Sequence, residues 1–247
     1  MNTKIYEESF TGFRLKYCFI HSGTEKYMNP YVKETDCLSY DIKASEPYIL
    51  MHKQFYTEST DIRYIEYKSL INLTSLALLP FKCCIMHAVA FIWNGYAWLM
   101  TGPSGTGKTT QYKNWKNIHQ DNVEMICGDM PVLEINEQNK VVVHPSPWNG
   151  KERIKGNNKA PLAGIVILEQ SNNDEIELMK PEDSAVPLLY QLAVIPQDEK
   201  QIRMIAEIEN AILQNYPVWK LRNKGDIVSV RLAEEEFHKH LKRMGSL

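Results

Sequence analysis

The spacing of apolar positions changes along the chain, and the predicted element changes with it. Before about residue 65, apolar and aromatic residues form short runs between Gly, Asn-Pro and charged stretches, a pattern typical of β-strands. These runs cover residues 13–20, 48–51 and 61–65. Residues 66–80 carry apolar positions that a helix would present broadly before Pro80 ends it. We therefore expect a β-rich N-terminal section over residues 1–80 that closes with a helix.

Strand-like apolar runs continue to residue 168, and several are joined by connections as short as hairpins, which indicates a mixed sheet. These runs cover residues 84–91, 96–101, 123–127, 132–135, 140–144 and 163–168. The rest of the chain has helical spacing at residues 181–192, 198–214 and 231–243, with a strand at 218–221. Pro181 suits a helix start, and Pro187 is expected to interrupt that helix. The pattern predicts an α/β fold: a core over residues 81–247 with a mixed sheet and a helical C-terminal section, in one continuous domain with residues 1–80 or separate from them.

Composition narrows the class of protein. Of 247 residues, 44% are apolar and the net charge is −2, which favours a globular protein and gives no electrostatic case for nucleic acid or an anionic membrane. The start of the chain lacks an apolar signal-peptide core, and no apolar run approaches membrane-spanning length, so we expect a cytoplasmic protein. The cysteines are odd in number and form no CxxC pair, which argues against a disulfide framework and a zinc site. They are Cys18, Cys37, Cys83, Cys84 and Cys127.

Residues 102–110, GPSGTGKTT, complete the Walker A pattern GxxxxGK[ST] between a strand-like run and a run of helical spacing. Glycines let successive backbone N–H groups point at phosphate oxygens, and the following helix adds its positive end. Lys108 would reach the β- and γ-phosphates of ATP, and Thr109 would place its hydroxyl on Mg²⁺. The alternative is a glycine-rich turn with an exposed lysine. The residues expected to bind the nucleotide are Gly102, Ser104, Gly105, Thr106, Gly107, Lys108, Thr109 and Thr110.

A phosphate-binding loop needs an acidic residue at the end of a nearby strand, to hold Mg²⁺ and to take the proton of an acceptor hydroxyl. Asp129 closes the run at 123–127, where a strand after the loop helix would return to the nucleotide. We expect Asp129 to serve the metal and the chemistry. The alternative is a turn aspartate between Gly128 and Pro131.

Five motifs in order carry a resemblance to a known family. They are residues 86–90 (MHAVA), 102–110 with Trp115, 128–131 (GDMP), 147–152 (PWNGKE) and 161–169 (PLAGIVILE). Together they resemble the HPr kinase/phosphorylase-like kinases, and more closely the standalone relatives sometimes labelled phosphoenolpyruvate-carboxykinase-like. The resemblance covers roughly residues 85–170. It implies the P-loop core shared by HPr kinase and phosphoenolpyruvate carboxykinase, and Mg²⁺-assisted phosphoryl transfer from ATP to a hydroxyl that is commonly a serine.

The resemblance also assigns roles to single residues. His87 matches a histidine near the transferred phosphate, and Lys151 matches the lysine of a Pro-Trp-x-Gly-Lys motif that would face the phosphates or the acceptor. Trp148 is expected to pack this loop, and His144, Glu152 and Arg153 are supporting candidates. Relatives usually have two adjacent aspartates where this chain has Gly128-Asp129, and they tend to have Lys and Arg where it has Met130 and Gln170. The catalytic candidates are Asp129, His87, Lys108 and Lys151, and the metal candidates are Thr109 and Asp129.

We therefore expect a kinase that phosphorylates a serine or threonine hydroxyl of a protein or peptide. A small-molecule kinase or carboxykinase-like enzyme, and an ATP-binding regulatory module with a weakened site, are the alternatives. The segment that defines HPr recognition is not recognisable, so a true HPr kinase is not expected. The sequence leaves open the acceptor, the nucleotide preference, the oligomeric state (a homo-oligomer included), and whether losing one aspartate abolishes catalysis.

Overall fold

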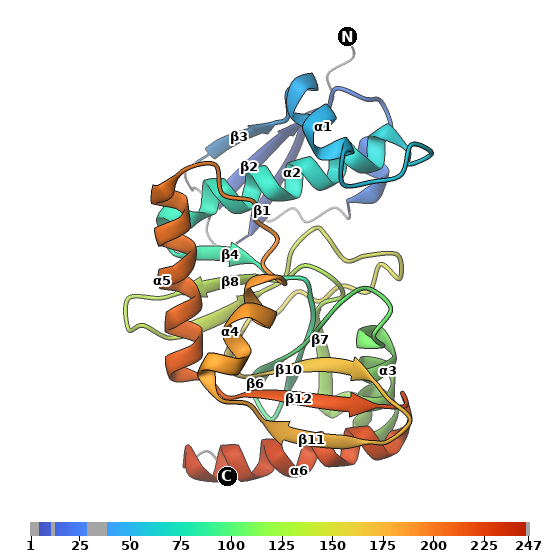
Figure 1. The fold of residues 1–247 in the computed structure, drawn as a ribbon, viewed down its shortest axis with the longest axis vertical. Helices are drawn as coiled ribbons and strands as arrows, with labels where there is room; N and C mark the ends of the chain where they lie inside the picture. Colours follow the sequence, from blue (N-terminus) through green and yellow to red (C-terminus); the bar gives the residue numbers. More distant parts are fainter. Residues whose placement is uncertain (1–4, 11–12, 29–38, 246–247) are drawn as a thin grey trace.

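The computed structural model describes residues 5–10, 13–28 and 39–245, and it is a mixed α/β protein. Nine strands form one mixed sheet, in which β4-β8-β9-β10-β6-β5-β7 are successive neighbours and β12 and β11 extend from β10 (Figure 1). A predicted mixed sheet is thereby confirmed. The strands are β4 (Cys83–Ile85), β5 (Ala88–Trp93), β6 (Tyr96–Thr101), β7 (Val123–Cys127), β8 (Val132–Ile135), β9 (Val141–His144), β10 (Ala160–Gln170), β11 (Glu175–Leu178) and β12 (Val218–Asn223).

The N-terminal part forms a separate three-stranded sheet with two helices beside it, at the top of Figure 1. Strand β2 (Phe13–Cys18) pairs antiparallel with β1 (Ile5–Phe10) and parallel with β3 (Ser39–Lys43). Helices α1 (Glu46–Lys53) and α2 (Ile62–Leu78) follow, and a 3₁₀ turn at Leu79–Phe81 contains the helix-ending Pro80. A 3₁₀ turn at Thr24–Tyr27 lies between β2 and β3.

Two strand predictions in this part are wrong, because residues 48–51 lie in α1 and residues 61–65 lie at the start of α2. The Ser45 hydroxyl accepts a hydrogen bond from the Tyr48 N–H (3.4 Å), and the Asp61 carboxylate accepts one from the Arg63 N–H (3.0 Å). Each side chain caps its helix, and Pro47 suits the first turn. These caps outweigh the β-propensity of the tyrosines and isoleucines that follow them.

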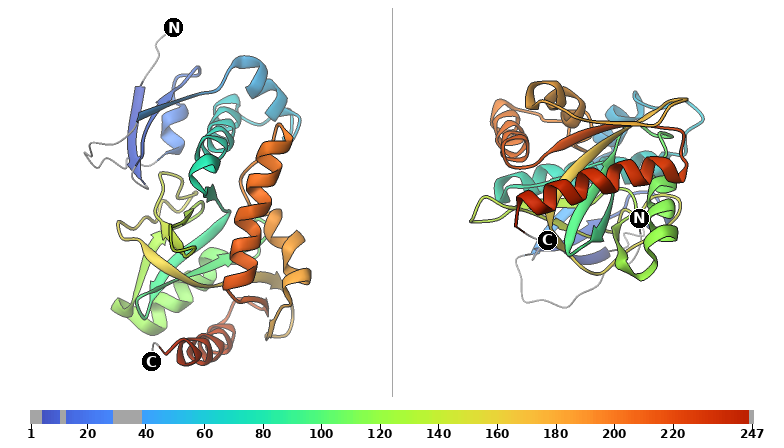
Figure 2. Two further views of the ribbon diagram at one scale, coloured as in Figure 1. Left: turned by 90° about the vertical axis from the view of Figure 1, so that its left-hand side faces the viewer. Right: turned by 90° about the horizontal axis from the view of Figure 1, so that it is seen from below.

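Four further helices follow in the described part of the chain. Helix α5 runs beside the sheet from the level of α2 downward, and α6 crosses below the sheet (Figure 2). The predicted helices are confirmed within a few residues, although Pro187 lies inside α4 without ending it at that point. The helices are α3 (Lys108–His119), α4 (Pro181–Leu189), α5 (Glu199–Asn215) and α6 (Ile227–Arg243), with a 3₁₀ turn at Gln120–Asn122 after α3.

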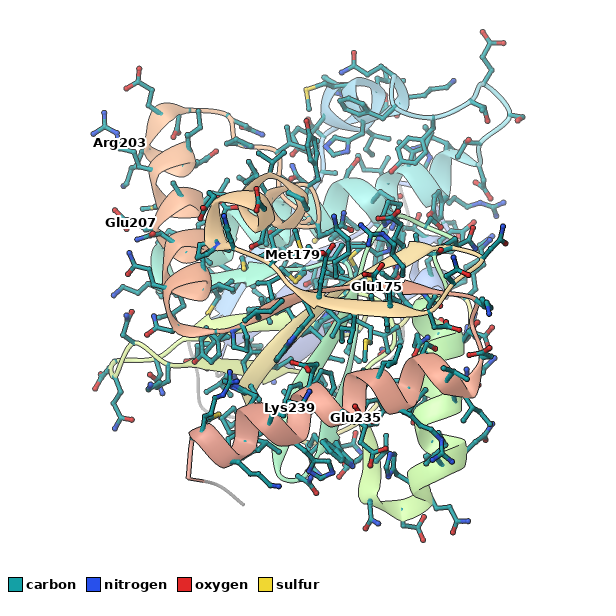
Figure 3. All side chains as sticks on the ribbon, turned by 60° about the horizontal axis from the view of Figure 1, so that its bottom comes forward. Glu175, Met179, Arg203, Glu207, Glu235 and Lys239 are labelled. Atoms are coloured by element: carbon teal, nitrogen blue, oxygen red, sulfur yellow. The ribbon has the colours of Figure 1, made fainter. Side chains whose placement is uncertain are left out.

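The edge strand β11 was not predicted, because its sequence Glu-Ile-Glu-Leu is as polar as a loop. Its two glutamates pair with Arg222 of β12, with Glu175 Oε2 2.9 Å from Nη1 and Glu177 Oε1 3.3 Å from Nη2. Glu175 is labelled on this strand in Figure 3. Charged side chains of this kind are typical of a protected sheet edge.

One buried cluster joins the two parts of the chain. It includes Tyr17 and Tyr67 from the N-terminal part and Met130 and Trp148 from the other part. Residues on both sides of position 80 therefore share a core, and the division at residue 80 stays a prediction.

The predictions about cysteines and membrane spans can be compared with the described residues. Cys18, Cys83, Cys84 and Cys127 are free thiols, and Cys37 lies outside the described residues, as do the first four residues of the chain. Within the described ranges, no helix combines the length and the apolar character that a membrane crossing requires.

Candidate functional site

The loop at residues 102–107 joins the end of β6 to the start of α3, in the order that the sequence pattern predicts. Gly102, Gly105 and Gly107 all have positive φ, at 140°, 88° and 98°. A Cβ atom at Gly102 would lie 2.9 Å from the backbone oxygen of Leu168, so both conformation and space require glycine there. The loop therefore holds a backbone shape that residues with side chains adopt at a cost.

The N-terminus of α3 is open to an anion. Its N-cap is Gly107, which has no side chain and so makes no side-chain cap hydrogen bond to the first turn. The first N–H groups of a helix lack partners within the helix and carry the positive end of its dipole. Hydrogen bonds connect α3 to β12 and α6, because Gln111 Nε2 donates to Asn223 Oδ1 (3.2 Å) and to Ser229 Oγ (2.7 Å).

Lys108 lies in the curve of the loop. Its Nζ donates to the backbone oxygens of Gly102 (2.8 Å) and Pro103 (3.0 Å), and the residue is 8% exposed. Burial lowers the pKa of the Lys108 ammonium, and the charge of Asp129 opposes that shift. In the described part of the chain, no carboxylate lies within 4 Å of this ammonium. The loop thus holds a buried cation that only neutral carbonyl groups contact directly.

The other predicted loop residues lie where the pattern places them. Thr106 Oγ1 donates to the Pro103 oxygen (2.9 Å), which closes the turn. Ser104 is exposed, Thr109 is half-buried in the first turn of α3, and Thr110 is exposed on the side of Gly225. Gln170, where relatives tend to have arginine, donates from Nε2 to the Gly105 oxygen (2.9 Å) and so supports the loop from β10.

Strand register brings His87 and Asp129 to the same edge of the sheet as the loop. Ala88 pairs with Thr101 at the end of β6, and Ala90 pairs with Cys127 at the end of β7. The Ala88 N–H donates to the Asp129 backbone oxygen (2.8 Å), and Thr101 Oγ1 donates to the His87 oxygen (2.7 Å).

His87 Nε2 lies 3.5 Å from Asp129 Oδ1, so the two side chains form a pair. Burial lowers the pKa of His87, and the positive charges of Lys108 and Lys68 lower it further, while Asp129 opposes the shift. The imidazole is therefore neutral at neutral pH and can accept a proton. The pair offers two proton acceptors at the edge where the loop begins.

The segment at residues 146–153 packs against Asp129. A Cβ atom at Gly150 would lie 3.1 Å from the Asp129 Cβ and 3.3 Å from its Cγ. Met130 N–H donates to the Trp148 oxygen (3.0 Å), and Ser146 Oγ donates to the Met130 oxygen (2.6 Å). Trp148 is fully buried, with its ring edge-on to Tyr17 at 6.2 Å, so the packing role predicted for it is confirmed.

Lys151 follows Gly150 and is exposed. Its charge acts on Tyr64, whose pKa is raised first by burial and then by Asp129, with Lys151 opposing. Lys151 and Asp129 therefore act in opposite directions on the pKa of the same tyrosine of α2.

Gly128, where relatives carry a second aspartate, has no room for a side chain. A Cβ atom there would lie 2.7 Å from the Ile154 oxygen and 3.0 Å from the Asn149 oxygen, and its φ is not positive. The close approach of the 149–154 backbone, and not a special conformation, therefore requires glycine at this position.

The supporting candidates lie around this segment. Glu152 pairs with Lys113 of α3 (3.1 Å), and Arg153 Nη2 donates to the Lys26 oxygen (3.0 Å). His144 instead bonds Glu134 on the neighbouring strand, Nε2 to Oε2 at 2.6 Å, and this bond lowers the pKa of Glu134. His144 is thus committed to a strand pair away from the His87–Asp129 contact.

Helix α2 brings residues to the site that sequence reasoning missed. The charge of Asp129 acts on Tyr64, Tyr67 and Lys68 of this helix. No local signal could have found them, because only tertiary packing places α2 beside residues that lie 60 positions further along the chain.

Comparisons with known proteins were made on sequence and on structure. No protein-family model matches the sequence, and no curated protein matches it. The fold is similar to the structure of the Hpr(Ser) kinase/phosphatase from Coxiella burnetii, at 15% sequence identity and a TM-score of 0.39. The match covers 65% of this chain and 98% of the other.

Proposed function

We propose that this protein transfers the γ-phosphoryl group of ATP to a serine or threonine hydroxyl of a protein or peptide. The observation that carries the proposal is the open N-terminus of α3 with the buried Lys108 ammonium beside it, at the edge where His87 and Asp129 meet. A glycine loop, a helix N-terminus and a desolvated cation form a site for a polyphosphate. The hydroxyl of a protein or peptide, as acceptor, rests on the resemblance in motifs.

The residues divide the reaction between them. Backbone N–H groups of the loop and Lys108 would hold the β- and γ-phosphates. The acceptor oxygen bonds to the γ-phosphorus, the bond from that phosphorus to the β,γ-bridging oxygen breaks, and ADP leaves with the electron pair. The hydroxyl proton passes to the Asp129 carboxylate, with the neutral His87 imidazole beside it as a second acceptor.

The residues present fit Mg²⁺ delivered with the nucleotide. The described residues contain no group of three or more His, Cys, Asp or Glu side chains able to hold a metal. Mg²⁺ at nucleotide sites is commonly held by one or two carboxylates, substrate phosphates and water. Thr109 and Asp129 would hold the ion here, and the Asp129 side chain is 21% exposed, which leaves its carboxylate accessible. When bound, the ion neutralises phosphate charge.

Titration calorimetry with Mg²⁺ and either ATP or ADP tests the loop. Lys108→Ala should weaken ATP binding by about 1.5–3 kcal/mol, roughly 10- to 100-fold, since it removes charged hydrogen bonds to phosphate. Lys53→Ala, an exposed lysine of α1, is the matched control and should bind like wild type. Equal ATP affinity in wild type and Lys108→Ala would remove the nucleotide from this loop.

A regulatory module with a weakened site is distinguished by turnover. Such a protein binds ATP through the same loop but transfers no phosphoryl group. A small-molecule kinase would turn over ATP with a small hydroxyl compound and leave peptides unmodified. Calorimetry and a turnover assay on the same preparation therefore separate the three functions.

A further inference from the structure

One face of α2 carries Tyr64 and Lys68, and the charge of Asp129 acts on the pKa of both. Tyr64, Lys68 and Asn72 are four residues apart in the helix and so share this face. At one end, Asn72 Oδ1 accepts a hydrogen bond from the Ile195 N–H (2.6 Å). The same segment reaches the site, because the Gln191 oxygen accepts a hydrogen bond from the His87 N–H (2.7 Å). One end of this face is therefore hydrogen-bonded to residues 191–195, the segment that also accepts a hydrogen bond from His87.

The other end of the face meets the Asp129 side. Tyr64 packs edge-on to Tyr27 at 5.5 Å, and the 3₁₀ turn that carries Tyr27 also supplies the Lys26 oxygen to which Arg153 donates (3.0 Å). The neighbouring Tyr67 lies in the same buried cluster as Met130, the residue after Asp129. Lys68 lies between these two ends of the face, and the charge of Asp129 acts to raise its pKa.

Lys68 carries a cation that no carboxylate of the described residues approaches within 4 Å. Its Nζ lies 5.6 Å from the ring centre of Tyr64 and 5.5 Å from that of Tyr67. In the described ranges, no hydrogen bond or ion pair within 4 Å engages this ammonium. Burial lowers the pKa of Lys68 and Asp129 opposes the shift. Lys68 is half-buried, so its ammonium is partly removed from water, and two tyrosine rings recover only part of that cost.

We propose that Lys68 is a catalytic residue that binds the transferred phosphoryl group from the acceptor side, opposite Lys108. This inference rests on the proposed function. During transfer the new bond joins the acceptor oxygen to the γ-phosphorus while the bond to ADP breaks, and the acceptor proton goes to Asp129. Lys68 keeps its own proton and neutralises charge on the phosphoryl oxygens. The N-terminal part of the chain therefore completes the site.

ADP with aluminium fluoride, which mimics a phosphoryl group in transfer, tests this role without knowledge of the acceptor. Affinity for ADP is measured with and without aluminium fluoride, in the presence of Mg²⁺, for wild type, Lys68→Met, Lys68→Arg and the control Lys53→Met. In wild type and Lys53→Met, the fluoride complex should bind more tightly than ADP alone. In Lys68→Met the gain in affinity caused by aluminium fluoride should be smaller by a factor on the order of 10², the effect of removing one charge-stabilising donor. The affinity of Lys68→Met for ADP alone should equal that of wild type within error. Lys68→Arg should recover part of the gain.

A second readout reports on position. The pKa of the His87 imidazole, followed by NMR in the absence of nucleotide, should rise in Lys68→Met, because a neighbouring positive charge is removed. It should stay at the wild-type value in Lys53→Met. The same spectra show whether each variant is folded.

The outcomes separate the two proposals. If aluminium fluoride tightens ADP binding in wild type and equally in Lys68→Met, the assignment of Lys68 is overturned and the proposed function stands. If Lys68→Met loses affinity for ADP alone by the same factor, Lys68 serves the nucleotide or the fold, and the assignment is again overturned. If wild type shows no tightening, phosphoryl transfer itself fails, and the role of Lys68 fails with it.

Discussion

An alanine at Gly128 should destabilise the protein through a defined contact. The added Cβ would lie 2.7 Å from the Ile154 oxygen and 3.0 Å from the Asn149 oxygen. Both are backbone atoms, so no side-chain rotation relieves the contact, and the 149–154 segment must move. Overpacking of this kind costs about 1–3 kcal/mol. We expect Gly128→Ala to lower the free energy of unfolding by that amount.

The same contact predicts the effect on activity. Gly150 lies in the segment that must move and touches the Asp129 side chain, so Gly128→Ala should also slow phosphoryl transfer. Gly128→Asp, which restores the pair of aspartates found in relatives, should reduce both stability and transfer for the same reason.

Urea unfolding followed by tryptophan fluorescence measures the stability change. Gly156→Ala provides a graded comparison, because its Cβ would lie only 1.7 Å from the Met125 oxygen. The expected order of stability is wild type, then Gly128→Ala, then Gly156→Ala. Wild-type stability in Gly128→Ala, or faster transfer in Gly128→Asp, would refute the steric explanation.

Two further predictions concern the residues around Asp129. Lys151→Ala should cost about 2–4 kcal/mol of transition-state stabilisation and leave ATP affinity nearly unchanged. Steady-state kinetics measures the first quantity and calorimetry the second. Weaker ATP binding with an unchanged rate at saturation would instead place Lys151 on the nucleotide. Burial and Lys108 lower the pKa of His87, so the folded state binds fewer protons at His87 than the unfolded chain does. The free energy of unfolding should therefore decrease as the pH falls below the unfolded pKa of about 6.5. Wild type should therefore lose more unfolding free energy than His87→Asn on acidification through this range, and an equal loss in the two proteins would contradict the direction of the shift.

Much of the fold follows from local patterns. The strands at 96–101, 123–127 and 132–135 have the predicted bounds, because each is a short apolar run that turn residues end. Residues 48–51 and 61–65 were mistaken for strands because helix caps, which depend on one side-chain hydrogen bond each, decide between helix and strand there.

The candidate site also contains some features that the local sequence predicts and others that it does not. The loop around Lys108 is visible in the sequence because its shape is made by consecutive residues. The meeting of His87 and Asp129 depends on strand register. The resemblance in motifs placed His87 only near the transferred phosphate. Lys68 could not be predicted, because nothing local shows which face of α2 packs toward the sheet edge. The need for Gly128 could not be predicted either, since it follows from the path of a segment more than 20 residues away.

The central claim, that this site moves a phosphoryl group, is tested most directly by Asp129→Asn. The measurement follows the γ-phosphate of ATP with Mg²⁺ by ³¹P NMR, for wild type and Asp129→Asn, beside the ATP affinity of each. With water as the acceptor, wild type should convert ATP to ADP and inorganic phosphate. Asp129→Asn should bind ATP but turn it over more slowly by a factor on the order of 10²–10⁴, the usual contribution of a positioned base. Equal turnover in the two proteins, or ATP bound by wild type and never consumed, would contradict the claim.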